Sequence, residues 1–181
     1  SPFFEGTDNV LPLSVKKLLK EGAESGKRLV FLINPPYAED GVAGAKGETR
    51  KGVASKTLVN NTMPKLGRAN RQLYTQFLYQ CEQVASEYGF KQKSVGVFCK
   101  PTFMVSGSFK KFRDYWYRQY SYKSGFMFQA SHFADVSGAW GVSFTLWSEG
   151  KTDIKQDLPV TLKDVVDESV ISLGVKDLYS A

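Results

Sequence analysis

The chain alternates between short apolar runs and amphipathic segments, a pattern that predicts alternating strands and helices. The runs 29–33 and 94–99 have the length of strands, and the first is apolar on both faces, which is typical of a central strand in a parallel sheet. Between them, apolar side chains recur at helical spacing, at Leu73, Phe77, Cys81, Val84 and Tyr88. This spacing predicts a helix over 71–88 that ends at Gly89.

The remaining predicted elements are helices over 13–21 and 109–120, strands over 125–130 and 140–148, and a short helical stretch over 162–169. Ser137-Gly138 separates the last two strands, so we expect them to form an antiparallel hairpin. Alternating strands and helices indicate an α/β fold. We expect a partial Rossmann-like sheet that is mostly parallel, closed by this hairpin and covered by helices on both faces.

The segment 38–70 is rich in glycine and charge and has little periodicity, so it is predicted to be a long basic loop. Residues 1–150, including this loop, are expected to form one domain. Residues 151–181 are expected to be a linker with a short C-terminal helical segment.

Composition narrows the classes of function. With 42% hydrophobic and 23% charged residues, the chain is globular rather than disordered, and its longest apolar run is too short to span a membrane. Two cysteines and one histidine provide neither a disulfide framework nor the spacing of a zinc site, so we expect a reduced, cytoplasmic protein without a metal.

The positive charge is unevenly distributed. The 24 Lys and Arg residues outnumber the 18 Asp and Glu residues, and the excess concentrates in 38–71 and 104–123. This favours a polyanionic partner such as nucleic acid, although a solvated basic surface is an equally good explanation of charge alone.

The motif Asn34-Pro35-Pro36-Tyr37 directly follows the first apolar strand. Ligand sites of open α/β sheets lie outside such strand ends. Taken alone, the four residues are also explained by a proline-rich turn with an aromatic plug.

The tetrad resembles the catalytic motif of amino-methylating methyltransferases that use S-adenosylmethionine. Three later segments are similar, in order, to N6-adenine DNA methyltransferases: Leu73-Tyr74-x-x-Phe77-Leu78, Val95 to Pro101 followed by Phe109-x-x-Phe112-Arg113, and His132-Phe133 followed by Trp140 to Trp147. The resemblance covers residues 11–147. It implies the target-base part of a methyltransferase sheet, from a restriction–modification or phage-type system.

The resemblance implies a chemistry for the tetrad, with Asn34, Pro35, Pro36 and Tyr37 as catalytic residues. The side-chain oxygen of Asn34 and the carbonyl of Pro35 accept the hydrogens of the adenine N6 amine, and Tyr37 stacks on the flipped-out base. Phe133 is the candidate for a second aromatic contact, and a core position explains it equally well. Seven basic residues are candidates for binding the DNA phosphates: Lys46, Arg50, Lys51, Lys56, Lys65, Arg68 and Arg71.

The resemblance does not extend to the cofactor-binding half. No glycine-rich turn follows a first strand, and Asp8 is the one candidate for the acidic residue near the cofactor. We therefore expect the chain to be part of an enzyme whose cofactor half is supplied by the same protein or by a partner subunit, or to be an inactive relative. In isolation it is expected to be inactive. An RNA or protein-glutamine methyltransferase, or a nucleic-acid-binding or assembly module, remains an alternative.

Overall fold

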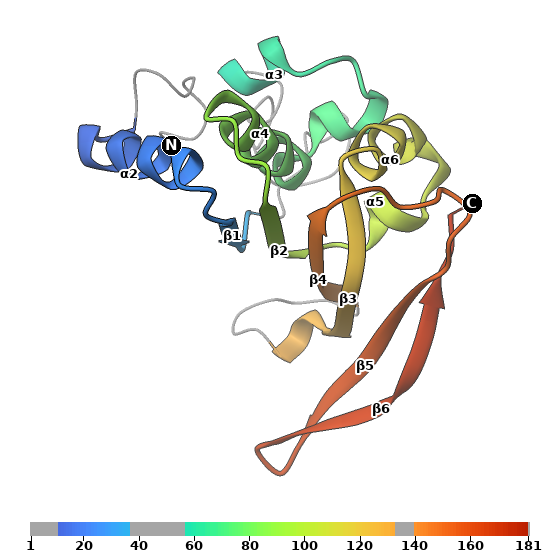
Figure 1. The fold of residues 1–181 in the computed structure, drawn as a ribbon. Helices are drawn as coiled ribbons and strands as arrows, with labels where there is room; N and C mark the ends of the chain where they lie inside the picture. The colour runs from blue at the N-terminus through green and yellow to red at the C-terminus, as the bar shows by residue number, and fades with distance from the viewer. Residues whose placement is uncertain (1–10, 37–56, 133–139, 181) are drawn as a thin grey trace. The chain divides into compact units, whose positions relative to one another are not determined.

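The computed structural model describes residues 11–36, 57–132 and 140–180 (Figure 1). The chain divides into two compact units. The first comprises Ser1–Val30 and Pro35–Lys93, and the second comprises Phe31–Asn34 and Ser94–Ala181. No helix within the described ranges is long and apolar enough to cross a membrane.

The first unit is helical. Its elements are α2 (Leu13–Glu24), α3 (Leu58–Thr62), the 3-10 helix η2 (Gly67–Arg71) and α4 (Leu73–Glu87). The predicted α4 is confirmed, and it ends where expected, because Gly89 adopts a φ of 74° and the N–H of Phe90 then bonds the carbonyl of Ala85 at 2.9 Å. The apolar stripe is not the whole of its buried surface, because Thr75, Gln76 and Glu82 are buried too.

The sheet has six strands in the order β1-β2-β4-β3-β5-β6. The strands are β1 (Leu29–Ile33), β2 (Lys93–Cys99), β3 (Tyr120–Gln129), β4 (Gly141–Glu149), β5 (Leu158–Val166) and β6 (Ser169–Leu178). β4 pairs antiparallel with both β2 and β3, and β5 pairs antiparallel with β6, whereas β3 and β5 are parallel. The expected β3–β4 pairing is confirmed, but the expectation of a mostly parallel sheet is wrong. The N–H of Leu29 bonds the carbonyl of Gln92 at 2.9 Å, so β1 and β2 begin at the same end.

One face of the sheet in the second unit is covered by helices. α5 (Thr102–Val105), the 3-10 helix η3 (Gly107–Phe109) and α6 (Lys110–Tyr117) contribute aromatic rings that pack on β4. Trp147 is the centre of this core, with its ring centroid 6.0 Å from that of Phe103 and 6.2 Å from that of Trp116. These rings are fully buried, and their burial holds the helical layer on the sheet.

The opposite face carries a row of phenylalanines. Phe144 pairs across the strands with Phe98 and Phe126, with ring centroids 4.8 Å and 5.2 Å away. A Cβ on Gly96 would lie 3.2 Å from Leu32, so the side chain of Leu32 lies on this face as well. Helices were expected on both faces, whereas α5, η3 and α6 of the second unit lie on the face opposite to these phenylalanines.

Two expectations about strands were wrong. The run 29–33 was expected to be central, but β1 is at the sheet edge, where the side chains of Val30 and Leu32 are 60% and 73% exposed. The stretch 162–169 was expected to be helical but belongs to the β5–β6 hairpin (red in Figure 1). The valines and the isoleucine of this hairpin favour strands, and Asp167 and Glu168 form its turn with φ of 46° and 61°.

The region 109–120 also differs from expectation. Phe109 belongs to η3, α6 ends at Tyr117 and β3 already begins at Tyr120, so the predicted helix is divided among three elements. The ring of Tyr120 stacks on that of Trp116 at a centroid distance of 4.0 Å. The aromatic spacing that suggested a continuous helix therefore brings two rings together at the turn from α6 to β3.

Candidate functional site

Asn34 is the first residue after β1, at the carboxyl end of the strand. Its side chain is exposed, Pro35 is buried and Pro36 is exposed. The strand ends here because neither proline can donate a hydrogen bond to a neighbouring strand. The buried ring of Pro35 anchors the turn and leaves Asn34 at the surface. Tyr37 lies outside the described residues.

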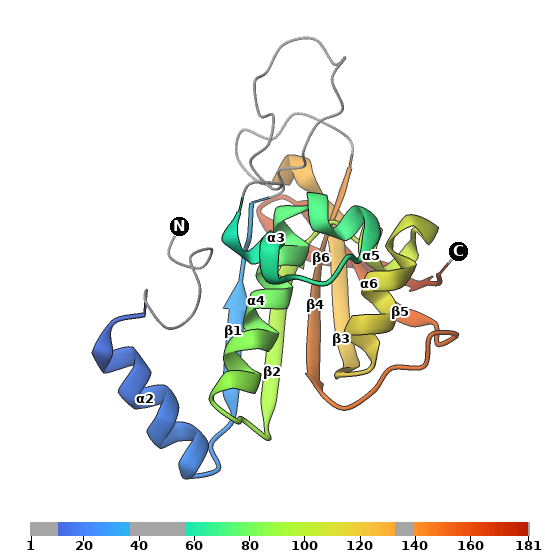
Figure 2. The same ribbon diagram turned by 90° about the horizontal axis from the view of Figure 1, so that it is seen from above.

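In the second unit, the ends of β2 and β3 and the beginning of β4 lie at the same end of the sheet (Figure 2). Lys100 follows β2, the 3-10 helix η4 (Ala130–His132) follows β3, and Trp140 precedes β4. The Lys100 ammonium lies 5.1 Å from the centroid of the Trp140 ring, and the N–H of Ala130 bonds the carbonyl of Trp140 at 2.9 Å. The residues that flank these strand ends are therefore a carboxamide, a cation and an indole, and the cation already lies over the indole ring.

Lys100 and Trp140 were not among the residues expected in the site. Both residues flank a strand at the end of the sheet where Asn34 follows β1. That position can be read from the sequence once the strands are assigned. Their pairing depends on β4 lying beside β2, which the local pattern does not encode.

Cysteine nucleophiles are excluded at this edge. Cys99 is the last residue of β2, and burial raises the pKa of its thiol to about 12, with a smaller opposing effect from Ser143. Burial likewise raises the pKa of Cys81 to about 12. Both thiols are therefore protonated at neutral pH. Within the described ranges, no three His, Cys, Asp or Glu side chains are grouped so that they could hold a metal ion.

A cavity of about 430 Å³ lies on the phenylalanine face of the second unit. Phe98, Phe126 and Phe128 form one wall, and the β5–β6 hairpin forms the other. At its rim, Nε2 of His132 lies 2.8 Å from Oδ1 of Asp164, which joins η4 to β5. The contact gives His132 a structural partner.

The basic residues expected to contact DNA are described only in part. Lys65, Arg68 and Arg71 are exposed and lie in or near η2 of the first unit. Seven other expected site residues lie outside the described ranges: Asp8, Tyr37, Lys46, Arg50, Lys51, Lys56 and Phe133.

Arg113 of α6 belongs to the positively charged segment 104–123, but its side chain is only 1% exposed and is not placed to contact DNA. Its Nη1 donates hydrogen bonds to the carbonyls of Phe103 and Ser106 and holds α5 against α6.

No family model and no curated protein match this chain. Among solved structures, a modification subunit assigned to a type I restriction enzyme of Vibrio vulnificus YJ016 is similar with a TM-score of 0.51 at 15% identity, over 90% of this chain and 29% of that one. The type ISP restriction–modification enzyme LlaBIII bound to DNA gives a TM-score of 0.46 at 12% identity, over 88% and 12%. The DrdV–DNA complex gives 0.44 at 13%, over 83% and 16%. The chain thus shares its fold with a part, less than a third, of a restriction-enzyme modification subunit.

Proposed function

We propose that this chain is the target-base part of a DNA methyltransferase that methylates the N6 amine of a flipped-out adenine. The observation that carries the proposal is the exposed Asn34 on a turn anchored by the buried Pro35, at the carboxyl end of β1. The fold shared with a restriction-enzyme modification subunit and the exposed basic residues near η2 support it.

The proposed chemistry follows from the weakness of the adenine amine as a nucleophile, since its lone pair is delocalised into the ring. Oδ1 of Asn34 and the carbonyl oxygen of Pro35 accept one amine hydrogen each and localise the lone pair on nitrogen. The fixed φ of proline keeps the carbonyl in place without a further entropic cost. Tyr37 stacks on the extruded base, a contact worth about 1–3 kcal/mol.

S-adenosylmethionine would supply the electrophilic methyl group for this reaction. The ends of β1, β2 and β3 lead into Asn34-Pro35, Lys100-Pro101 and Ala130-Ser131. None of these turns has the glycine that lets a backbone approach a ligand closely or a carboxylate that accepts ribose hydroxyls. The described residues therefore do not fit the cofactor, which we assign to another part of the enzyme or to a partner subunit.

The test is transfer of a radiolabelled methyl group from S-adenosylmethionine by the enzyme that combines this chain with its cofactor-binding half. DNA, RNA and protein are offered as substrates in separate reactions. We expect label in DNA, released as N6-methyladenine on digestion. Asn34→Ala should lower kcat at least a hundredfold. Asn34→Asp, which keeps an acceptor oxygen, should lower it less.

Each other outcome counts against the proposal. Label in RNA or in glutamine would assign the same amine chemistry to a different substrate. Unchanged methylation by the Asn34→Ala variant would remove Asn34 from the reaction. An absence of label in all three substrates would favour a binding or assembly module.

A further inference from the structure

We infer that Asn70 and Gln76 are positioning residues that fix a phosphate-binding surface formed by Lys65, Arg68 and Arg71. The inference rests on the DNA substrate of the proposed function. It concerns only the first unit, in which the segment 57–71 lies against α4. All three cations are exposed, whereas the side chain of Gln76 is fully buried.

Gln76 connects α4 to both ends of this segment. Its Oε1 accepts a hydrogen bond from Oγ1 of Thr57 at 2.7 Å, and its Nε2 donates to the carbonyl of Asn70 at 2.8 Å. A buried carboxamide is costly unless its donors and acceptor are satisfied, so the geometry of both contacts is strongly specified. The backbone at residue 70 is thereby held at a fixed place on α4.

Asn70 in turn closes the segment that carries the cations. Its Oδ1 accepts from the N–H of Leu66 at 2.7 Å. Its Nδ2 donates to Oδ1 of Asn60 at 3.0 Å and to the carbonyl of Pro64 at 3.1 Å. One side chain therefore fixes the backbone on both sides of Lys65 and joins it to α3.

Two further bonds complete the framework. Oγ1 of Thr75 donates to the carbonyl of Ala69 at 2.5 Å, between Arg68 and Arg71 along the chain. The hydroxyl of Tyr79 donates to the carbonyl of Thr62 at 3.1 Å. The polar side of α4 is thus buried because it binds the backbone of the basic segment.

This arrangement has a functional consequence because binding to phosphates costs less entropy when the cations are already placed. A mobile loop with the same charges would pay that cost on binding. Preorganisation therefore acts on affinity, whereas the number of charges acts on the salt dependence.

The test measures binding of the 181-residue chain to a fluorescein-labelled 30-base-pair duplex by anisotropy, at several salt concentrations. The double variant Arg68→Gln/Arg71→Gln should reduce the slope of log K against log salt by about 2. Asn70→Ala should weaken binding about fivefold and leave the slope unchanged, because every charge remains. Thr75→Val removes the bond to the carbonyl of Ala69 and leaves every charge in place, so it should also weaken binding at an unchanged slope.

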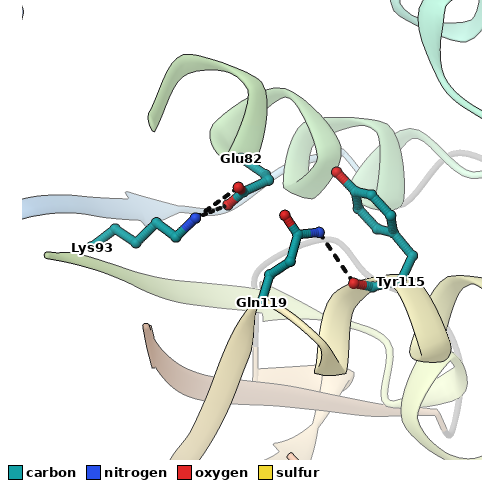
Figure 3. A network of polar contacts seen from close by, with 4 residues as sticks. All are labelled: Glu82, Lys93, Tyr115 and Gln119. Atoms are coloured by element: carbon teal, nitrogen blue, oxygen red, sulfur yellow. Dashed lines mark hydrogen bonds and ion pairs between the residues drawn. The ribbon is translucent and has the colours of Figure 1, made fainter. Parts of the chain in front are cut away.

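The matched control is Gln119→Ala in the second unit. The Nε2 of Gln119 donates to the carbonyl of Tyr115 at 3.1 Å, so this variant also removes a side-chain amide bond to the backbone (Figure 3). Its DNA affinity should equal that of the wild type. Circular dichroism identifies the temperature range in which each variant is folded. If Asn70→Ala does not fold, Thr75→Val decides the matter, and wild-type affinity in that variant would then overturn the inference.

Wild-type affinity in a folded Asn70 variant would overturn the inference, as would an unchanged salt slope in the double arginine variant or an absence of DNA binding by the wild-type chain. The expected binding results together with no methylation by the complete enzyme would refute the proposed function and leave this inference standing.

Discussion

The ammonium of Lys93 lies 2.7 Å from both carboxylate oxygens of Glu82, and the two side chains are 14% and 4% exposed (Figure 3). The contact joins α4 to the first residue of β2, both in the first unit. A charge pair so shielded from water is sensitive to the loss of one partner, because the remaining charge keeps its desolvation cost.

Lys93→Met should lower the free energy of unfolding by about 3 kcal/mol, measured by urea denaturation. The double variant that also carries Glu82→Gln leaves no ionised group at this place and should recover part of the loss. Equal destabilisation of the single and double variants would show that packing of the lysine stem, rather than its charge, matters here.

Glu168→Gly should stabilise the chain by about 1 kcal/mol. Glu168 has a φ of 61° in the β5–β6 turn, a conformation that costs a residue with a Cβ and that glycine adopts freely. Thermal unfolding measures the change. Ser169→Gly, which alters the next exposed residue at an ordinary φ, is the control and should not stabilise. If both glycine variants behave alike, turn strain is not the cause.

The folded chain should lose stability as the pH rises from 9 toward 12. Burial raises the pKa of both Cys81 and Cys99 from 9.0 to about 12, so in this range the unfolded state has released protons that the folded state retains. Each thiol then lowers the free energy of unfolding by about 1.4 kcal/mol per pH unit. Urea denaturation at pH 8, 9, 10 and 11 tests this, and Cys99→Val should flatten the dependence. A curve unaltered by that substitution would contradict the assignment.

Arg113→Met should destabilise the folded chain by about 2–3 kcal/mol without altering the DNA affinity of the molecules that remain folded. The two carbonyls that Arg113 bonds would lose their charged donor. Lys110→Ala, on the exposed side of the same helix, should change stability by less than about 0.5 kcal/mol. Weaker DNA binding by Arg113→Met at unchanged stability would show instead that this arginine contributes to DNA binding.

Local periodicity was sufficient for α4, because a buried helix imposes regular spacing on Leu73, Phe77 and Cys81. It did not reveal the buried Gln76, whose partners come from a segment that precedes the helix and has no apolar period of its own. Polar burial depends on tertiary contacts, and for this reason 57–70 was predicted as part of a long loop although it contains α3 and most of η2.

The candidate site was likewise predictable where it depends on local sequence and not where it depends on tertiary contacts. The end of β1 and its exposed Asn34 follow from an apolar run that stops at two prolines. The contact between Lys100 and Trp140 joins residues that are distant in sequence and requires the strand order β2-β4. The stretch 162–169 was mistaken for a helix because a few apolar residues at helical spacing are equally compatible with a twisted pair of strands.

The outer side of β1 has a practical consequence for the isolated chain. Leu29–Ile33 is an uncharged edge strand whose Val30 and Leu32 project into solvent. Such an edge recruits other backbones, so purified molecules should associate reversibly through it as their concentration rises. Leu32→Lys would place a charge on this edge strand and should keep the protein monomeric. Light scattering, which measures the average particle mass, tests this.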